Sequence, residues 1–283
     1  MRRFTVAFMV FVVAFMIACP PPEERVITIA YVERAPDIAT TNLVAAVMQE
    51  QMGIGVNLIS STTADMWEAV ATGEADAMVS AWLPTTDEQY LAQTDERVVV
   101  LSPILEGTRT GLVVPQYVEV ESIEDLDDEA QQFDNQIIGV EPDAGIMVVT
   151  ERAMQEYELE EFQLVEGSDD EMTSELESAI EEVQWIVVTG MYPHWMFEEF
   201  DLEWLEDPEG LFGENEFIAS VVRINLSEEM PDVYQFLDNF SLTTQELQQL
   251  MQANREPATN PYENAVQWIQ QNETRVQEWI PQD

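Results

Sequence analysis

The chain has 283 residues, of which 46% are hydrophobic, so it is long enough for one large domain or for two lobes with a core each. It carries 10 basic against 56 acidic side chains, a net charge of −46, and every basic residue is arginine. This balance excludes a nucleic-acid-binding protein that works through basic patches. The carboxylates are spread along the whole chain and would repel one another at low salt, so we interpret them as an adaptation to high ionic strength. The alternative is an acidic but otherwise ordinary surface.

An apolar leader opens the chain. Arg2 and Arg3 precede residues 4–18, a stretch that is interrupted by a single threonine and is too short and wrongly flanked for a stable membrane span. We therefore expect residues 1–18 to be a secretory signal that is removed on export. The protein is then expected to work outside the cytoplasmic membrane.

The leader ends at Cys19, the only cysteine of the chain. Residues 16–19 resemble the end of a bacterial lipoprotein signal, in which the cysteine is lipidated and becomes the first mature residue. We expect Cys19 to anchor the protein in the membrane and residues 19–25, with their three consecutive prolines, to form a short stiff tether. The alternative for this cysteine is a free thiol in the core. A single cysteine excludes an intrachain disulfide and a cysteine-based zinc site.

Behind the tether, apolar runs with the length of buried strands alternate with helical patterns, which is typical of an α/β fold with mostly parallel sheets. Asp37 is expected to cap the first helix, and Gly53 to end it. Trp82 is expected at the carboxyl end of a strand, where ligands bind in open α/β sheets. The elements predicted here are a strand at 26–32, a helix at 38–48, a strand at 55–59, a helix at 63–72 and a strand at 75–81.

A second β/α series starts near residue 111, and a largely helical segment ends the chain. Ser122 is expected to cap an acidic helix, and Thr243 with Glu246 forms a capping box. The other predicted elements are strands at 111–114, 136–140, 162–166, 185–189 and 217–224, and helices from 144, at 170–182, at 227–240 and within 260–280. From this order we expect lobe I to comprise residues 26–110 and 222–283, lobe II to comprise residues 111–221, and two crossing strands to act as a hinge.

Several motifs in a fixed order resemble the substrate-binding subunit of glycine betaine importers of the ATP-binding-cassette (ABC) class. They cover nearly the whole chain behind the tether and are residues 66–70, 73–86, 111–115, 139–142, 144–147, 189–190, 193–197, 205–208 and 237–240. The resemblance implies the two-lobed periplasmic-binding-protein fold of type II, which closes over its ligand. It also implies delivery of that ligand to a membrane permease driven by a separate ATPase.

The resemblance further implies an aromatic cage for the ligand. A quaternary ammonium group has a positive charge but no N–H bond, so it is held by the negative faces of aromatic rings. The family pattern nominates Trp82 from lobe I and Trp195 from lobe II as cage walls, with Trp67 as a further candidate. The carboxylate of a betaine would be held by backbone N–H groups at the turn of Asp37 and Ile38, where the helix dipole also favours an anion.

Three positions depart from the family pattern and bear on specificity. Met191 and Leu242 stand where the family commonly has tryptophan, and neither offers an aromatic face. Tyr192 is a candidate to replace a missing ring. Asp37 brings a negative charge next to the expected carboxylate anchor. Choline, carnitine, proline betaine or another small methylated amine or sulfonium therefore remains an alternative to glycine betaine.

The sequence offers little for catalysis. His194 is the only histidine, which excludes multi-histidine metal sites, and we expect it to orient Trp195 or to donate to the ligand. No lysine and no glycine-rich phosphate-binding signature is present. We therefore expect a receptor without a cofactor or metal. An exported enzyme on the same fold and a module that has lost ligand binding are the alternatives.

Overall fold

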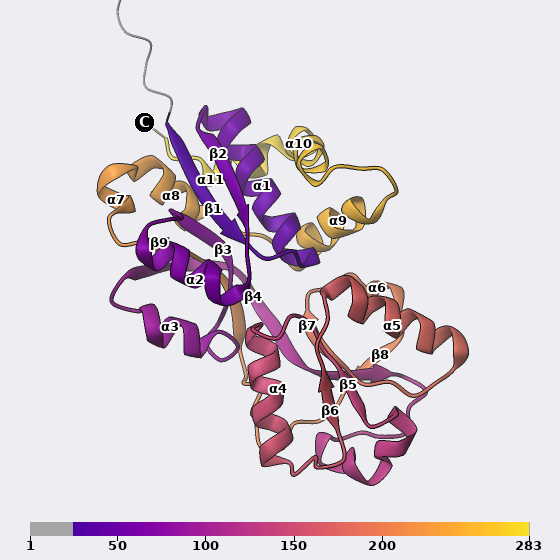
Figure 1. Cartoon of the computed structure of the whole chain (residues 1–283). Coiled ribbons are helices and arrows are strands. Elements are labelled where there is room, and N and C mark those ends of the chain that lie inside the picture. The colour runs from indigo at the N-terminus through magenta and orange to yellow at the C-terminus, as the bar shows by residue number, and fades with distance from the viewer. Residues whose placement is uncertain (1–24, 283) are drawn as a thin grey trace, which may run out of the picture.

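The computed structural model describes residues 25–282. The expected signal, Cys19 and all of the tether except Arg25 lie outside the described residues. The chain forms two lobes, one built from its beginning and its end and the other from its middle (Figure 1). Within residues 25–282 no helix is long and apolar enough to cross a membrane.

The sheet of lobe I is parallel at its core. β1 (Val26–Tyr31) lies between β2 (Gly55–Ser60) and β3 (Ala77–Leu83) and is parallel to both. β3 is buried along its whole length, as expected for a continuous apolar run in a sheet that is covered on both faces. The helices of this part are α1 (Ala35–Met52), α2 (Thr63–Thr72) and α3 (Glu88–Thr94).

Lobe II repeats the plan with shorter strands. β5 (Gln136–Ile138) lies between β6 (Gln163–Val165) and β7 (Val188–Tyr192) and is parallel to both. The remaining elements of this lobe are two 3₁₀ segments (Ile123–Asp125 and Asp127–Phe133), α4 (Gly145–Glu156), α5 (Asp169–Glu182), α6 (Met196–Glu199) and β8 (Leu202–Trp204).

Two long strands join the lobes. β4 (Val98–Pro115) is antiparallel to β9 (Glu216–Arg223) over its first part and to β7 from Arg109 to Val113. β9 is in turn antiparallel to β3 from Phe217 onward. β4 therefore runs from one sheet into the other, and β9 brings the chain back into lobe I.

The chain ends in helices on lobe I, and two of them, the yellow α9 and α10 of Figure 1, pack against α1. They are α7 (Leu226–Glu229), α8 (Pro231–Asn239), α9 (Thr244–Arg255), α10 (Pro261–Gln271) and α11 (Glu273–Trp279). The rings of Trp268 and Trp279 stack with centroids 5.9 Å apart, and both side chains are buried. They pack these helices together, as their amphipathic spacing indicates.

Several predicted elements differ in detail. The helix predicted at 227–240 is broken before Pro231, which has no N–H for a preceding turn and starts α8 instead. The segment 260–280 is interrupted at Asn272. Ser122 precedes 3₁₀ turns and makes no side-chain cap. The strand predicted at 185–189 begins only at Val188.

The start of the first helix also differs from the prediction. α1 begins at Ala35, with Arg34 in extended conformation as its N-cap residue and Pro36 in its first turn. The fixed φ of proline favours this early start. Asp37 is therefore inside the helix and does not cap it.

Candidate functional site

A small enclosed cavity lies where the lobes meet. Its volume is about 10 Å³, and its wall combines two residues of lobe I with seven of lobe II. The lining residues are Arg34, Pro36, Val140, Asp169, Met172, Thr189, Met191, His194 and Met196. They follow the carboxyl ends of β1, β5 and β7 or belong to β7, α5 and α6. The carboxyl ends of the strands form the edge where open α/β sheets bind ligands.

Arg34 is the cation of this cavity. Its side chain is 3% exposed, and its Nε lies 2.8 Å from Oδ2 of Asp37, although the two atoms lack the alignment of a hydrogen bond. Burial by itself would lower the pKa of the guanidinium, but the surrounding carboxylates of Asp37, Glu141, Asp87 and Asp169 outweigh it and raise that pKa. Arg34 is thus surrounded by four carboxyl groups that come from both lobes.

Asp37 is buried beside Arg34, on the first turn of α1. Burial raises the pKa of its carboxyl, and Arg34 only partly offsets this. Ser80 lies close enough to favour the charged form, but its hydroxyl is directed at Sδ of Met66, 3.7 Å away. Neither carboxylate oxygen of Asp37 accepts a hydrogen bond from the described residues. The expected role of Asp37 as helix cap is thus replaced by that of a buried partner of Arg34.

Asp169 and His194 form a second polar pair in the cavity. Oδ2 of Asp169 accepts a hydrogen bond from the Ala35 N–H of lobe I at 3.1 Å and lies 3.2 Å from Nε2 of His194. Nδ1 of His194 accepts from the Met196 N–H at 3.3 Å, so the geometry assigns the ring proton to Nε2. Burial would raise the pKa of Asp169, but His194 and the Ala35 N–H outweigh it, and the pKa is lowered. The bond to Ala35 links the two lobes directly.

Asp87 lies next to this group, on the loop that follows β3. Its Oδ2 accepts a hydrogen bond from the Trp82 N–H at 2.9 Å. Burial raises the pKa of this carboxyl from 3.8 to about 7, while the Trp82 N–H and Arg34 act in the opposite direction. The neighbouring carboxylates of Asp37 and Glu216 add to the rise.

We expect Asp87 to make stability depend on pH. Between about pH 4 and about pH 7 the folded protein holds a proton at Asp87 that the unfolded chain has released, so this group's contribution to the free energy of unfolding falls as pH rises and levels off above about pH 7. Asp87→Asn, which keeps an oxygen for the Trp82 N–H, should remove this contribution and stabilise the protein most at high pH. Urea unfolding of both proteins across this range measures it, and parallel stability curves would contradict it.

The structure places the nominated residues in different surroundings. Met191 and His194 line the cavity. Trp82 and Leu242 are buried and belong to the large cluster that also holds Met191. Trp67 belongs to a second buried cluster of lobe I, where its ring stacks on Tyr90 at 6.5 Å.

The remaining nominated residues lie on both sides of the lobe interface. Tyr192 ends β7 and contacts Phe197 edge to face, with ring centroids 5.6 Å apart. Ile38 is half-buried on α1. None of the tryptophans and tyrosines nominated from the sequence belongs to the cavity lining.

Trp195 has a different partner from the one expected. The guanidinium of Arg255, at the end of α9 in lobe I, lies 3.7 Å from the centroid of the Trp195 ring in lobe II. Arg255 also pairs with Glu199 at 3.1 Å, and Gln248 donates to Glu198 at 2.8 Å. Trp195 is therefore part of a contact between the lobes.

Sequence reasoning missed Arg34, Asp169 and Thr189. One signal was available for Arg34: it is one of ten arginines in a chain of great acidic excess, and it follows a predicted buried strand. Thr189 lies in the family motif at 189–190 but was not nominated for the site, and Asp169 carries no such signal. Within residues 25–282, no group of three or more histidine, cysteine, aspartate or glutamate side chains is arranged to hold a metal ion.

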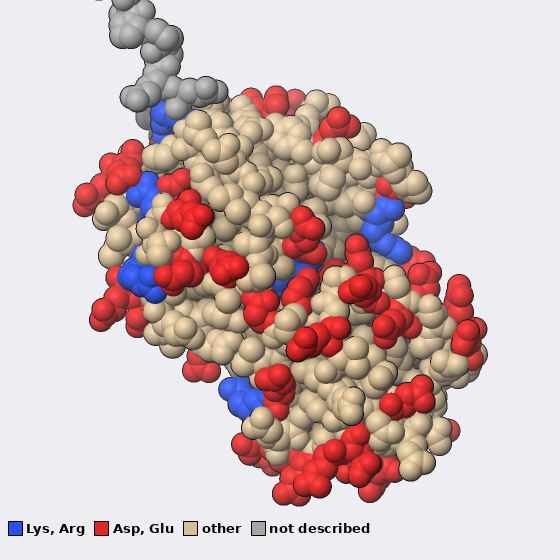
Figure 2. Space-filling view, viewed as in Figure 1, with Lys and Arg blue, Asp and Glu red and all other residues tan. Residues whose placement is uncertain are grey.

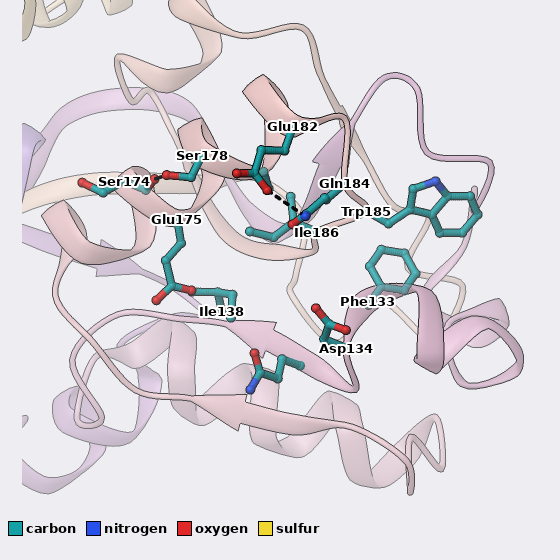
Figure 3. A pocket seen from close by; sticks show the side chains of 12 residues that line it. Phe133, Asp134, Ile138, Ser174, Glu175, Ser178, Glu182, Gln184, Trp185 and Ile186 are labelled. Atoms are coloured by element: carbon teal, nitrogen blue, oxygen red, sulfur yellow. Dashed lines mark hydrogen bonds between the residues drawn. The ribbon is translucent and has the colours of Figure 1, made fainter.

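A second hollow lies on the surface of lobe II (Figure 3). Side chains of α5, such as Glu175 and Ser178, form one wall of it, and Phe133 and Trp185 pack together at its end with ring centroids 5.3 Å apart. All of its lining residues lie in lobe II.

Two lobes joined by crossing strands around a cavity of buried charge are typical of solute-binding proteins that close over a ligand. The chain belongs to the family described as the substrate-binding domain of ABC-type glycine betaine transport systems, whose model matches residues 25–271. The resemblance noted from the sequence is thereby confirmed, and so are the class of protein and the type II fold.

Similarity to individual proteins supports the same family assignment. The chain is 39% identical over 154 residues to the glycine betaine/carnitine transport binding protein GbuC of Listeria monocytogenes, a match that spans 54% of this chain and about half (51%) of that protein's length. Lactococcal OpuAC, closed on glycine betaine, is 36% identical and superposes with a TM-score of 0.86 over 91% of this chain and 100% of that one. ProX of Borrelia burgdorferi is 34% identical, with a TM-score of 0.89 over 91% and 97%.

Proposed function

We propose that this protein is the extracytoplasmic receptor of an ABC importer that captures glycine betaine or a related small osmolyte between its lobes and delivers it to the permease for osmoprotection. The observation that carries the proposal is the cavity whose walls come from both lobes and whose charges are buried. A ligand held there contacts both lobes at once, so its binding stabilises the closed form. Choline, carnitine and proline betaine are the alternative ligands of the same site.

Direct contacts between the lobes support closure as the working motion. Besides the bond from Ala35 to Asp169, Asp143 of lobe II accepts a hydrogen bond from the Ala64 N–H at 2.8 Å and another from the Tyr90 hydroxyl. Because these bonds join separate lobes, an open form would have to exchange them for water. The ligand supplies the additional free energy that favours the closed form.

The surface fits work in a salt-rich medium. Carboxylates are scattered over the visible faces of both lobes, with few arginines between them (Figure 2). Their mutual repulsion is screened when salt is high. The signal at 1–18 and Cys19 support export and anchoring by a lipid, which the mass of the mature chain isolated from cells would test.

Calorimetric titration in molar salt tests the proposal. We expect saturable binding of a small methylated amine or amino-acid osmolyte, with the ligand recovered chemically unchanged. Glycine betaine, choline, carnitine and proline betaine are the first ligands. Conversion of a ligand would indicate an enzyme, and silence from every ligand of this class would point to a module that has lost ligand binding.

We expect Arg255→Gln and Trp195→Ala each to weaken ligand binding about tenfold, because both remove a cation–π contact that holds the closed form. Arg109→Gln is the matched control. It removes an arginine 4.5 Å from the centroid of the Trp204 ring, on the part of β4 that pairs with β7. An equal loss of affinity in the control would show that contact between the lobes is not the cause.

A further inference from the structure

The turn that opens α4 of lobe II is seated on α2, on α3 and on the loop between β3 and α3, all in lobe I. Asp143, two residues before α4, contacts the start of α2 and Tyr90 of α3. Gly145, the first residue of α4, packs closely against the carbonyl oxygen of Thr86 and against Asp87 in that loop. This turn is therefore a point of lobe II that several elements of lobe I receive.

Asp143 supplies a cap that α2 does not provide for itself. The first N–H groups of a helix have no partner within the helix. In α2 the Thr62 side chain accepts a hydrogen bond from the Asp65 N–H at 3.3 Å, whereas the Ala64 N–H donates across the lobe interface to Oδ2 of Asp143 at 2.8 Å. The positive end of the helix dipole also favours a carboxylate at this place. Separation of the lobes would leave the Ala64 N–H and the half-buried carboxylate of Asp143 to water.

Two stacked aromatic rings hold the second donor in place. The Tyr90 hydroxyl donates a hydrogen bond to the main-chain carbonyl oxygen of Asp143. The Tyr90 ring stacks on Trp67 of α2, with ring centroids 6.5 Å apart and ring planes inclined by 19°, and Trp67 is 1% exposed. A ring that is already fixed loses little further freedom when its hydroxyl forms a bond. Trp67 thus supports the surface of lobe I that Asp143 contacts.

Closure of the lobes has to overcome repulsion between like charges. The chain carries 56 acidic against 10 basic side chains, and both lobes expose carboxylates (Figure 2). Salt screens exposed charges, whereas it screens a partly buried contact much less. Asp143 brings its negative charge to a place on lobe I where an N–H group at a helix start receives it. At this place a charge that would otherwise repel lobe I holds it instead.

We propose that Asp143 is a positioning residue that holds lobe II on α2 and α3 in the closed form and thereby sets how fast a bound ligand is released. The proposal rests on the receptor function proposed above and adds to it a residue that is not among those lining the cavity. A ligand enclosed between the lobes leaves after they separate. A contact that forms only on closure therefore slows release and has little effect on ligand entry.

Release of a radiolabelled osmolyte in molar salt tests the proposal. The probe is the one that calorimetry finds to bind most tightly among glycine betaine, choline, carnitine and proline betaine. We expect Asp143→Ala to raise the dissociation rate constant about tenfold and to change the association rate constant less than about twofold, because the α2 cap is lost only from the closed form. Asp143→Asn keeps an acceptor for the Ala64 N–H and should raise the dissociation rate constant less, about threefold.

Asp127→Ala and Thr62→Ala are the matched controls. Asp127 is also half-buried and accepts a hydrogen bond from the Glu161 N–H at 3.0 Å, which is the same kind of bond within lobe II. Thr62 caps α2 from within lobe I. Both variants should lower stability without changing release. Equal acceleration of release in either control would overturn the proposal, because loss of stability would then explain the effect of Asp143→Ala.

Hydrogen exchange of the Ala64 amide tests the contact without a ligand. In the ligand-free protein we expect Asp143→Ala to speed this exchange at least about fivefold and Asp127→Ala to leave it unchanged. Equal exchange rates in all proteins would overturn the proposal. Unchanged release in Asp143→Ala would also overturn it and would leave the receptor function standing. If the unchanged protein binds none of the four osmolytes, the receptor function fails, and the proposed effect on release fails with it.

Discussion

Replacing Arg34 by methionine is expected to destabilise the protein by about 3 to 5 kcal/mol near pH 8, because it leaves buried carboxylates without their cation. Asp37 is 1% exposed and has no hydrogen-bond donor among the described residues, so it would carry most of this cost. The loss should be smaller near pH 5. Without Arg34 the pKa values of the neighbouring carboxyl groups rise, and protonation removes the unpaired charge as pH falls.

Urea unfolding at both pH values, in molar salt, measures the effect. Arg97→Met is the control, since Arg97 forms an exposed ion pair with Glu68 at 3.1 Å that water and salt screen. The control should leave the urea midpoint almost unchanged at either pH. A similar loss in both variants, or a loss at Arg34 that does not depend on pH, would contradict the account of Arg34 as a buried counter-ion.

Adding a methyl group at Gly145 is expected to weaken ligand binding at least about tenfold while the lobes stay folded. Gly145 is the first residue of α4 in lobe II and packs against lobe I. A Cβ atom there would overlap with the carbonyl oxygen of Thr86 and with Oδ1 of Asp87. A backbone atom cannot move aside as a flexible side chain can, so Gly145→Ala should hold the lobes apart.

Calorimetric titration gives the affinity, and small-angle scattering with and without ligand shows whether the lobes close. Gly167→Ala is the control, because a methyl group there comes no nearer than 3.4 Å to its neighbours, all within lobe II. It should bind ligand as the unchanged protein does. Unchanged affinity in Gly145→Ala would mean that the closed form tolerates the methyl group. It would contradict the prediction that close packing of Gly145 against lobe I is needed for closure.

The local order of the chain was predictable because it depends on neighbouring residues. Alternation of buried strands and helices gave the parallel strands of both lobes, and Gly53 and Gly73 do end α1 and α2 in left-handed conformation. The errors in the predicted helix boundaries also arose from neighbouring residues. Pro36 favoured an earlier start of α1 than Asp37 suggested, and Pro231 divided a predicted helix.

The family and the nominated cavity residues Met191 and His194 were also available from sequence, and Thr189 lies in the motif at 189–190 although it was not nominated. The surroundings of these residues in the folded protein could not be predicted from the sequence. Arg34 and Asp169 are separated by more than a hundred positions and belong to different lobes, and only the closed arrangement brings the Ala35 N–H to Asp169 at 3.1 Å. The sequence by itself thus determined the lobes and the class of protein. The tertiary structure decided which charges share the cavity and that Trp195 faces Arg255, because the packing of one lobe on the other selects these contacts and no local pattern encodes them.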